Sequence, residues 1–157
     1  MPGTFRVGLI SDTHGLLRPQ ALDFLQVSDH IIHAGDIVER QTLEQLAALA
    51  PLSAVRGNND RGPWAEALPE SVTLTLAGVA IHVIHDLSEL AIDPATDGVR
   101  VVVAGHSHKP SCAERDGVLH VNPGAAGRRR FTLPVSVGEL LIEEGAVRVR
   151  LVTLDVD

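Results

Sequence analysis

Five short apolar segments of this chain each end in side chains that can bind a metal ion. The segments and their polar ends are VGLIS before Asp12-Thr13-His14, HIIHAG before Asp36, LSAVRG before Asn58-Asn59-Asp60, VAIHVI before His85, and RVVVAG before His106-Ser107-His108. In α/β sheets, ligands bind beyond the carboxyl ends of the strands. We therefore expect these Asp, Asn and His side chains to converge on one point.

The donor types of this set indicate which ions would bind. Carboxylate, amide and imidazole groups without a thiolate favour divalent ions such as manganese, iron, zinc, cobalt or nickel. Seven residues qualify, more than the three or four protein ligands of one catalytic zinc, so the sequence predicts two ions. The candidate ligands are Asp12, His14, Asp36, Asn58, His85, His106 and His108.

The spacing of these residues supports one shared site. Asp12 and His14 are two residues apart, as are His106 and His108, and extended backbone would point both members of such a pair the same way. Gly35, Gly57 and Gly105 each precede a candidate ligand, where glycine permits a tight turn and a close backbone approach.

Each residue alone also has a structural interpretation. A single histidine near a strand end is commonly a hydrogen-bonded structural residue. Asp12 or Asp36 alone would suit a helix N-cap, and Asn58-Asn59-Asp60 alone would suit a turn. It is their joint occurrence at the ends of apolar segments that favours a metal site.

The first half of the chain alternates strand and helix patterns, which indicates parallel strands joined by helices. The predicted strands are Arg6–Ser11, His30–Ala34 and Leu52–Val55, and the predicted helices are Pro19–Leu25 and Thr42–Leu49.

The second half is richer in hairpin signals. Ala77-Gly78, Asp116-Gly117 and Glu144-Gly145 each separate two short strand patterns. The predicted strands around the first and last of these turns are Val72–Leu76, Val79–Ile84, Val135–Ile142 and Val147–Leu154. Val101–Ala104 is a continuous apolar run and is predicted to be a buried strand. Together the two halves predict one mixed α/β domain over residues 1–157, with two packed sheets flanked by helices.

Composition narrows the function. A net charge of -7 and only 3% aromatic residues disfavour a nucleic-acid binder, which needs a basic surface or stacking platforms. Bound metal ions would still let an acidic chain bind phosphate. The longest apolar runs are too short to span a membrane, and Cys112 is the single cysteine, so we expect a cytoplasmic protein.

The ordered motifs resemble those of the calcineurin-like metallophosphoesterases, and the short length is most similar to the YfcE-type phosphodiesterases. The motifs are Asp-x-His, Gly-Asp, Gly-Asn-x-Asp, a single His and Gly-His-x-His, followed by Asn122-Pro123-Gly124. This resemblance implies a four-layer αββα sandwich. It also implies a metal-dependent hydrolase that cleaves small phosphodiesters with a metal-activated hydroxide, with manganese as the first choice of ion.

The resemblance also implies a role for each ligand. Asp12, His14 and His108 would bind one ion, Asn58, His85 and His106 would bind the other, and Asp36 would bridge both. Asp36, Asn58 and His85 would thereby be the residues closest to the chemistry. A homodimer or a homotetramer is the assembly that the resemblance implies.

Two departures from the family pattern bear on substrate and site. Asn59 stands where many related phosphatases carry a histidine that protonates the leaving group, which disfavours phosphomonoesters and favours activated diesters. Asp86 follows His85 where a glycine is usual, either as a partner of the metal ligands or as a group that alters substrate entry.

Several other interpretations stay open. Asn59 and Arg128 are candidate substrate contacts, with a solvated surface cluster as the alternative for Arg128-Arg129-Arg130. His33 either orients the site or is a core histidine. A scaffold without catalysis is also open, because a eukaryotic retromer subunit resembles the same fold; the complete ligand set favours the enzyme.

Overall fold

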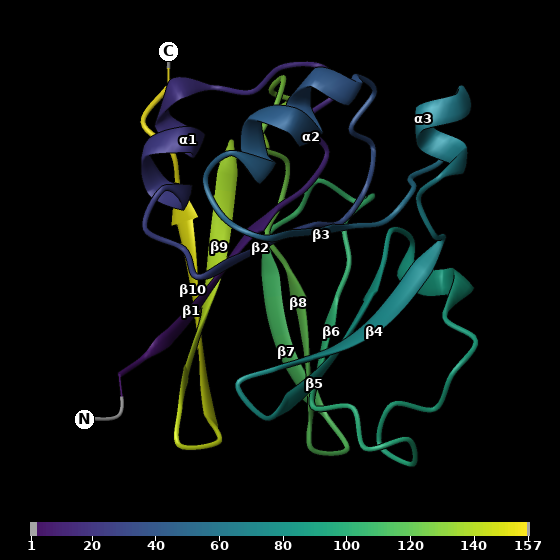
Figure 1. Cartoon of the computed structure of the whole chain (residues 1–157), viewed down its shortest axis with the longest axis vertical. Helices are drawn as coiled ribbons and strands as arrows, with labels where there is room; N and C mark the ends of the chain where they lie inside the picture. The colour runs from purple at the N-terminus through teal and green to yellow at the C-terminus, as the bar shows by residue number, and fades with distance from the viewer. Residues whose placement is uncertain (1–2, 157) are drawn as a thin grey trace.

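Two five-stranded sheets, packed face to face, form the centre of the structure, a computed structural model that describes residues 3–156 (Figure 1). The elements in chain order are β1 (Phe5–Ile10), α1 (Pro19–Leu25), β2 (His30–His33), α2 (Arg40–Ala47), β3 (Leu52–Ala54), α3 (Pro63–Glu66), β4 (Ser71–Leu76), β5 (Val79–Ile84), the 3-10 helix η1 (Leu87–Glu89), β6 (Val101–Val103), β7 (Ser111–Arg115), β8 (Val118–Asn122), β9 (Ser136–Glu143) and β10 (Ala146–Thr153).

Both sheets are mixed. The first has the order β10-β9-β1-β2-β3, in which β1, β2 and β3 are parallel and the β9–β10 hairpin is antiparallel to β1. The second has the order β4-β5-β6-β8-β7, in which β5, β6 and β8 are parallel and β4 and β7 close the edges as hairpin partners. The predicted hairpins around Ala77-Gly78, Asp116-Gly117 and Glu144-Gly145 are therefore confirmed.

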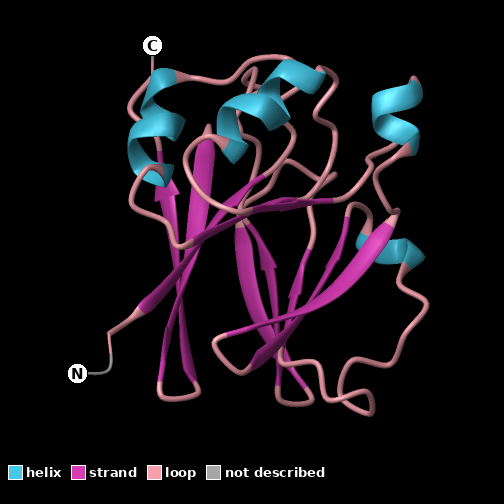
Figure 2. Cartoon of the chain, viewed as in Figure 1, coloured by secondary structure: helices cyan, strands magenta, loops and turns pink. Residues whose placement is uncertain are grey.

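Alternation of side chains along the strands separates the core into layers. Val7 and Leu9 of β1 point between the sheets, where they join Val101 and Val103 of β6. On the other face of the first sheet, Ile10 packs beneath helices α1 and α2, which lie together at one end of the molecule (Figure 2). The sandwich is thus held by an apolar layer between the sheets and a second layer under the helices.

The outer face of the second sheet is covered differently. Val102 of β6 packs against Leu87, Leu90 and Ile92, from the segment that contains η1. Asp93-Pro94 and Gly98 favour turns there, so the outermost layer on this side is a loop with one short 3-10 helix. The predicted αββα sandwich is confirmed, but its second outer layer consists of this segment and its one short 3-10 helix.

The predicted strands and helices are confirmed, with ends shifted by at most two residues. The sequence analysis missed α3 and η1, whose lengths of four and three residues are too short for a periodic pattern. Within residues 3–156, no helix combines the length and apolar character that a membrane crossing requires.

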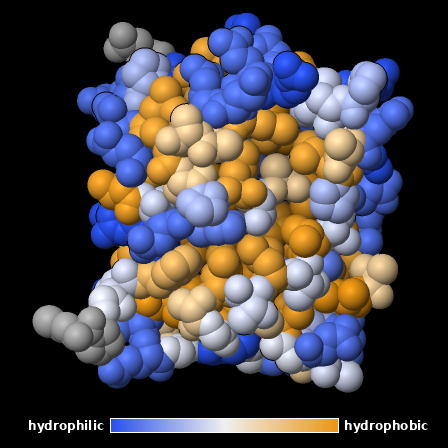
Figure 3. Space-filling view, in the orientation of Figure 1, coloured by the Kyte–Doolittle hydropathy of each residue, from blue (hydrophilic) through white to orange (hydrophobic). Residues whose placement is uncertain are grey.

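Polar side chains surround the apolar ones on the surface. In the space-filling view, hydrophobic atoms gather in the middle of the visible face, and hydrophilic atoms cover its upper end, over α2 (Figure 3). Large exposed hydrophobic residues in the described range are few, namely Val27, Val38 and Phe131.

Candidate metal centre

Loops from both sheets bring five of the candidate ligands together. Asp12 and His14 follow β1, Asp36 follows β2, His85 follows β5, and His108 follows β6. These residues form two groups of potential metal ligands. Within each group, the ligand atoms all lie within 4.8 Å of one another. The groups consist of Asp12, His14 and His108, and of Asp12, Asp36 and His85. The expected convergence beyond the strand ends therefore occurs, and strands of both sheets contribute to it.

The local backbone differs from the expected one. Asp12, His14 and Asp36 have φ values of 52°, 46° and 59°, in the left-handed region. The expectation that Asp12 and His14 lie in extended backbone was wrong, and His106 and His108 are left-handed too. Non-glycine residues adopt this strained conformation when surrounding contacts hold it, and such strain concentrates at functional sites. Here the backbone N–H of Asp12 donates to the Gly35 carbonyl at 2.9 Å, and that of His14 donates to the Asp36 carbonyl at 3.0 Å.

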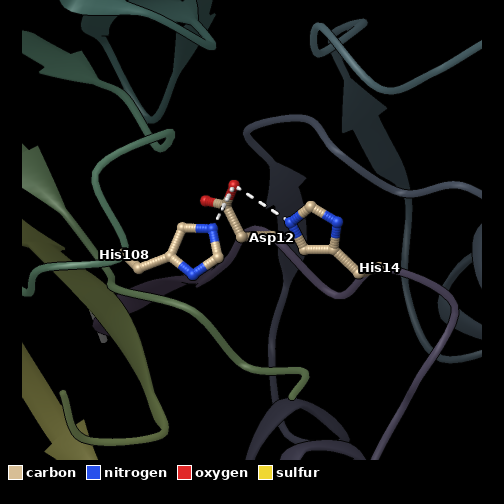
Figure 4. A group of neighbouring side chains, drawn as sticks. All are labelled: Asp12, His14 and His108. Carbon is tan, nitrogen blue, oxygen red and sulfur yellow. Dashed lines mark ion pairs between the residues drawn. The ribbon is translucent and has the colours of Figure 1, made fainter. Parts of the chain in front are cut away.

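Asp12 lies between two imidazoles (Figure 4). Its Oδ1 is 3.4 Å from His108 Nε2 and 3.8 Å from His14 Nε2. The other oxygen, Oδ2, accepts hydrogen bonds from the Ser11 hydroxyl at 2.7 Å and the His106 backbone N–H at 3.1 Å. One carboxylate oxygen is thus occupied by donors of the protein, which fixes the group and leaves Oδ1 directed at the imidazoles.

Asp36 lies between the two sides of the site. Its Oδ2 is 3.5 Å from His14 Nε2 and 3.3 Å from His85 Nε2, so it faces one member of each predicted ligand set. Asn59 holds this carboxylate from the other side: its backbone N–H donates to Oδ1 and its side-chain amide to Oδ2, both at 2.9 Å. This position suits the predicted bridging role. Asp12 Oδ1 is 3.9 Å from His85 Nε2, so Asp12 also reaches toward both sides.

His85 is oriented by the backbone. Its Nδ1–H donates to the Ala34 carbonyl at 2.7 Å, which places the lone pair of the neutral ring on Nε2, facing Asp36. Metal-binding histidines commonly have such a carbonyl partner on the nitrogen away from the ion.

The donor set fits divalent cations. Asp12 Oδ1, His14 Nε2 and His85 Nε2 are buried and have no hydrogen-bond partner among the described residues. Buried polar atoms are normally paired, so three unpaired polar atoms at one place point to a ligand. Two ligand atoms that are each about 2.1 Å from a tetrahedral ion lie about 3.4 Å apart, close to the carboxylate–imidazole distances observed here.

The electrostatics of the site also favour cations. Burial opposes ionisation of Asp12, but His108, His14 and Ser11 outweigh it and hold the pKa of Asp12 below its ordinary value. Burial lowers the pKa of His85, but the carboxylates of Asp36 and Asp12 outweigh it and raise that pKa to about 9. Two buried carboxylates therefore draw positive charge to this point.

The remaining two candidate ligands, Asn58 and His106, are exposed and lie outside these two groups. They line an open cleft of about 780 Å³ together with His85. Asp86 lies in the same cleft, with its Oδ2 at 3.8 Å from His106 Nε2, and it also accepts bonds from Ser88. This places Asp86 beside a predicted ligand at the cleft wall.

The two candidate substrate contacts lie on the other side of the site. Asn59 and Arg128 line a smaller pocket of about 270 Å³ that is shared with His14 and His108. The side-chain amide of Asn59 is engaged with Asp36, so Asn59 positions a candidate ligand as well as lining the pocket.

Asp60 is the principal residue whose role the sequence analysis missed. Its buried carboxylate accepts four backbone N–H bonds of 2.7 to 3.0 Å, from Gly57 and from the Asp36–Val38 loop. It thereby ties the loop after β2 to the loop after β3. The signal in the sequence was its place in the Gly-Asn-x-Asp motif.

His33 is a buried core histidine that braces the site without touching a candidate ligand. Its Nδ1 accepts from the Gly35 backbone N–H at 3.1 Å, so the proton is on Nε2, which is 3.1 Å from the Thr13 hydroxyl. Burial lowers the pKa of His33 to about 4. This neutral ring links the loop after β2 to the loop after β1.

The sequence matches the calcineurin-like phosphoesterase superfamily domain over residues 5–145. The chain belongs to this family. A probable metallophosphoesterase of Methanocaldococcus jannaschii is 34% identical over 155 residues, which cover 90% of this chain and 78% of the relative.

Solved structures share the fold of this metallophosphoesterase. A structure described as a novel archaeal phosphodiesterase has a TM-score of 0.77 and 25% identity, over 94% of this chain and 99% of that one. The phosphoesterase YfcE of E. coli has a TM-score of 0.69 and 20% identity, over 96% and 100%. Vacuolar protein sorting 29 of Cryptosporidium parvum has a TM-score of 0.77 and 20% identity, over 96% and 97%.

Proposed function

We propose that this metallophosphoesterase is a phosphodiesterase that uses two divalent ions to hydrolyse small phosphodiesters. The observation that carries the proposal is the position of Asp36 Oδ2, 3.5 Å from His14 Nε2 and 3.3 Å from His85 Nε2. A single carboxylate oxygen between imidazoles of two ligand sets suits a bridge between two ions.

Each ligand set has its own side of the site. Asp12, His14 and His108 would hold one ion, and His85, Asn58 and His106 would hold the other. Two such ions would activate water and stabilise the charge that develops on the phosphoryl oxygens. The protein would keep this arrangement rigid through Asn59, which holds Asp36, and through the Ala34 carbonyl, which orients His85.

The choice of ion follows from the donors. Carboxylate, amide and imidazole suit manganese, nickel, cobalt, zinc and iron(II), and we retain manganese as the first expectation. We also retain a cytoplasmic location and a homodimer or homotetramer as predictions.

Asn59 favours diesters as substrates. Its side chain is an amide that donates to Asp36, so it has no proton to give to a leaving alcohol at neutral pH. Hydrolysis without a general acid depends on a good leaving group, which disfavours ordinary phosphomonoesters. The similarity to the archaeal phosphodiesterase supports the same choice.

The likeness to vacuolar protein sorting 29 raises a scaffold as the second candidate. At 20% identity this likeness concerns the fold alone. A scaffold under no catalytic demand would be expected to lose ligands, whereas all seven candidate ligands are present in this chain. We therefore favour the enzyme.

The test is hydrolysis of bis(4-nitrophenyl) phosphate by metal-stripped protein after each ion is added back. We expect activity to return with manganese or another of these ions and to fall at least about a hundredfold in Asp36→Asn, because the bridging charge is lost. 4-Nitrophenyl phosphate, which releases the same leaving group, serves as the monoester comparison; a preference for diesters as such predicts that it is the poorer substrate. Normal turnover in a folded Asp36→Asn protein would refute the bridging role, and inactivity with every ion would favour the scaffold.

A further inference from the structure

Three consecutive arginines share one pocket with residues of the candidate metal centre. The pocket of about 270 Å³ is lined by His14, Asn59, His108, Arg128, Arg129 and Arg130. Because His14 and His108 are candidate metal ligands, anything that is bound at the metals on this side has the arginines within the same pocket.

Hydrogen bonds to the segment after β1 fix the position of the loop that carries Arg128, Arg129 and Arg130. The Ala126 backbone N–H donates to the Ser11 carbonyl at 3.0 Å, and Arg18 Nε donates to the Gly127 carbonyl at 3.1 Å. Gly127 lies so close to the Thr13 carbonyl that a Cβ there would collide with it. The segment that precedes Arg128 is therefore held against the residues on either side of Asp12.

Among the residues that the structure describes, two of the three guanidinium groups have no hydrogen-bond or ion-pair partner. Within residues 3–156, no carboxylate lies within ion-pair distance of Arg128 or Arg130, while Arg129 reaches the Val156 carbonyl at 3.5 Å. The larger cleft on the His85 side differs: its Arg56 pairs with Glu70 at 3.0 Å, and Asp86 and Glu89 also line it. Arg61 also lines that cleft, but carboxylates outnumber arginines there, whereas the lining of the smaller pocket has three arginines and no carboxylate. In a chain of net charge -7, the excess of positive charge at the site is thus on the His14 side.

A phosphodiester has one negative charge, which the metal ions would neutralise. Unpaired guanidinium groups in the same pocket match a second anion, since their donors fit phosphate in a bidentate geometry. We propose that Arg128 and Arg130 bind a terminal phosphate on one ester arm of the substrate. The preferred substrate class is then a small phosphodiester that also carries a phosphomonoester group. This inference rests on the proposed phosphodiesterase function.

The test uses two chromogenic diesters that differ by one phosphate: thymidine 5′-(4-nitrophenyl phosphate) with and without a 3′-phosphate. We expect kcat/KM to be about tenfold higher for the substrate with the 3′-phosphate. In R128Q/R130Q this preference should fall to less than about twofold, because the charged donors are removed. The matched control is Arg61→Gln, an arginine of the other cleft, in which the preference should persist.

Binding of reaction products separates this inference from the proposed function. Titration calorimetry of the manganese-loaded protein should show thymidine 3′,5′-bisphosphate binding about tenfold more tightly than thymidine 5′-monophosphate, and R128Q/R130Q should lose this difference. Equal affinities and equal kcat/KM values in the wild type would overturn the arginine site while leaving the phosphodiesterase intact. In a further outcome, the wild type cleaves neither diester and still binds the bisphosphate more tightly, with R128Q/R130Q losing that preference. This result would refute the phosphodiesterase and support the arginine site. A preference that persists in folded R128Q/R130Q would assign the second phosphate to other residues.

Discussion

At the scale of single residues, Asp12 and Asp36 are held in the same way. In each carboxylate, one oxygen accepts a backbone N–H, from His106 or Asn59, while the other oxygen faces imidazole nitrogens. In Asp36 this second oxygen also accepts the side-chain amide of Asn59. This arrangement orients a charged group without using up its capacity to bind an ion. The ligand types were predictable from the sequence, but the partners that orient them come from distant segments and were not.

His33 gives a prediction for the pH dependence of stability. Burial lowers the pKa of His33 to about 4, below its ordinary value of 6.5, so the unfolded chain binds this proton more readily than the folded one. The stability contribution of His33 is therefore complete above pH 6.5 and is lost as the pH falls toward 4. Between pH 7.5 and 5.5 the loss is about 1 kcal/mol.

Urea unfolding of the wild type and of His33→Asn, each at several pH values with a chelator present, measures this loss. The wild type should lose about 1 kcal/mol more than the variant between pH 7.5 and 5.5. Parallel pH profiles for the two proteins would show that His33 is not buried in its neutral form.

At the scale of elements, Asp60 connects two loops that carry candidate ligands. Its carboxylate accepts from the backbone of Gly57 and of the Asp36–Val38 loop, so the positions of Asp36 and Asn58 depend on it. Asp60→Ala would leave four backbone N–H donors, three of them buried, without a partner. We expect it to lower the free energy of unfolding by about 4 kcal/mol and to weaken metal binding.

Chemical denaturation together with metal titration checks this prediction. Asp23→Ala is a suitable control, because Asp23 is exposed on α1, and its effect should stay within about 0.5 kcal/mol. A loss below about 1 kcal/mol in Asp60→Ala would mean that the two loops keep their positions without this carboxylate.

The elements themselves were largely predictable, since apolar runs and Gly-containing turns mark most strands. Their pairing was not: β1 lies between β2 and β9, and β9 is more than a hundred residues further along the chain. The left-handed backbone at Asp12 and His14 could not be predicted from local patterns either, because it is held by hydrogen bonds that their N–H groups donate to carbonyls of the neighbouring loop.

At the scale of the whole molecule, charge limits the substrates. The chain has a net charge of -7, and the larger cleft beside His85 includes Glu70, Asp86 and Glu89. A long nucleic acid would meet repulsion over most of this surface, whereas a small diester needs only the site itself.

We therefore expect no binding of duplex DNA below about 100 µM at physiological salt, and no cleavage of it under conditions where a small diester is hydrolysed. Gel-shift and nuclease assays at two salt concentrations measure both. Micromolar binding with a steep salt dependence would contradict this prediction and favour a nuclease.

The central claim is that one site holds two ions with Asp36 between them, and anomalous diffraction from manganese-soaked crystals tests it most directly. We expect two peaks, one beside His14 and His108 and one beside His85, with Asp36 within bonding distance of both. One peak, or two peaks of which only one contacts Asp36, would contradict the claim.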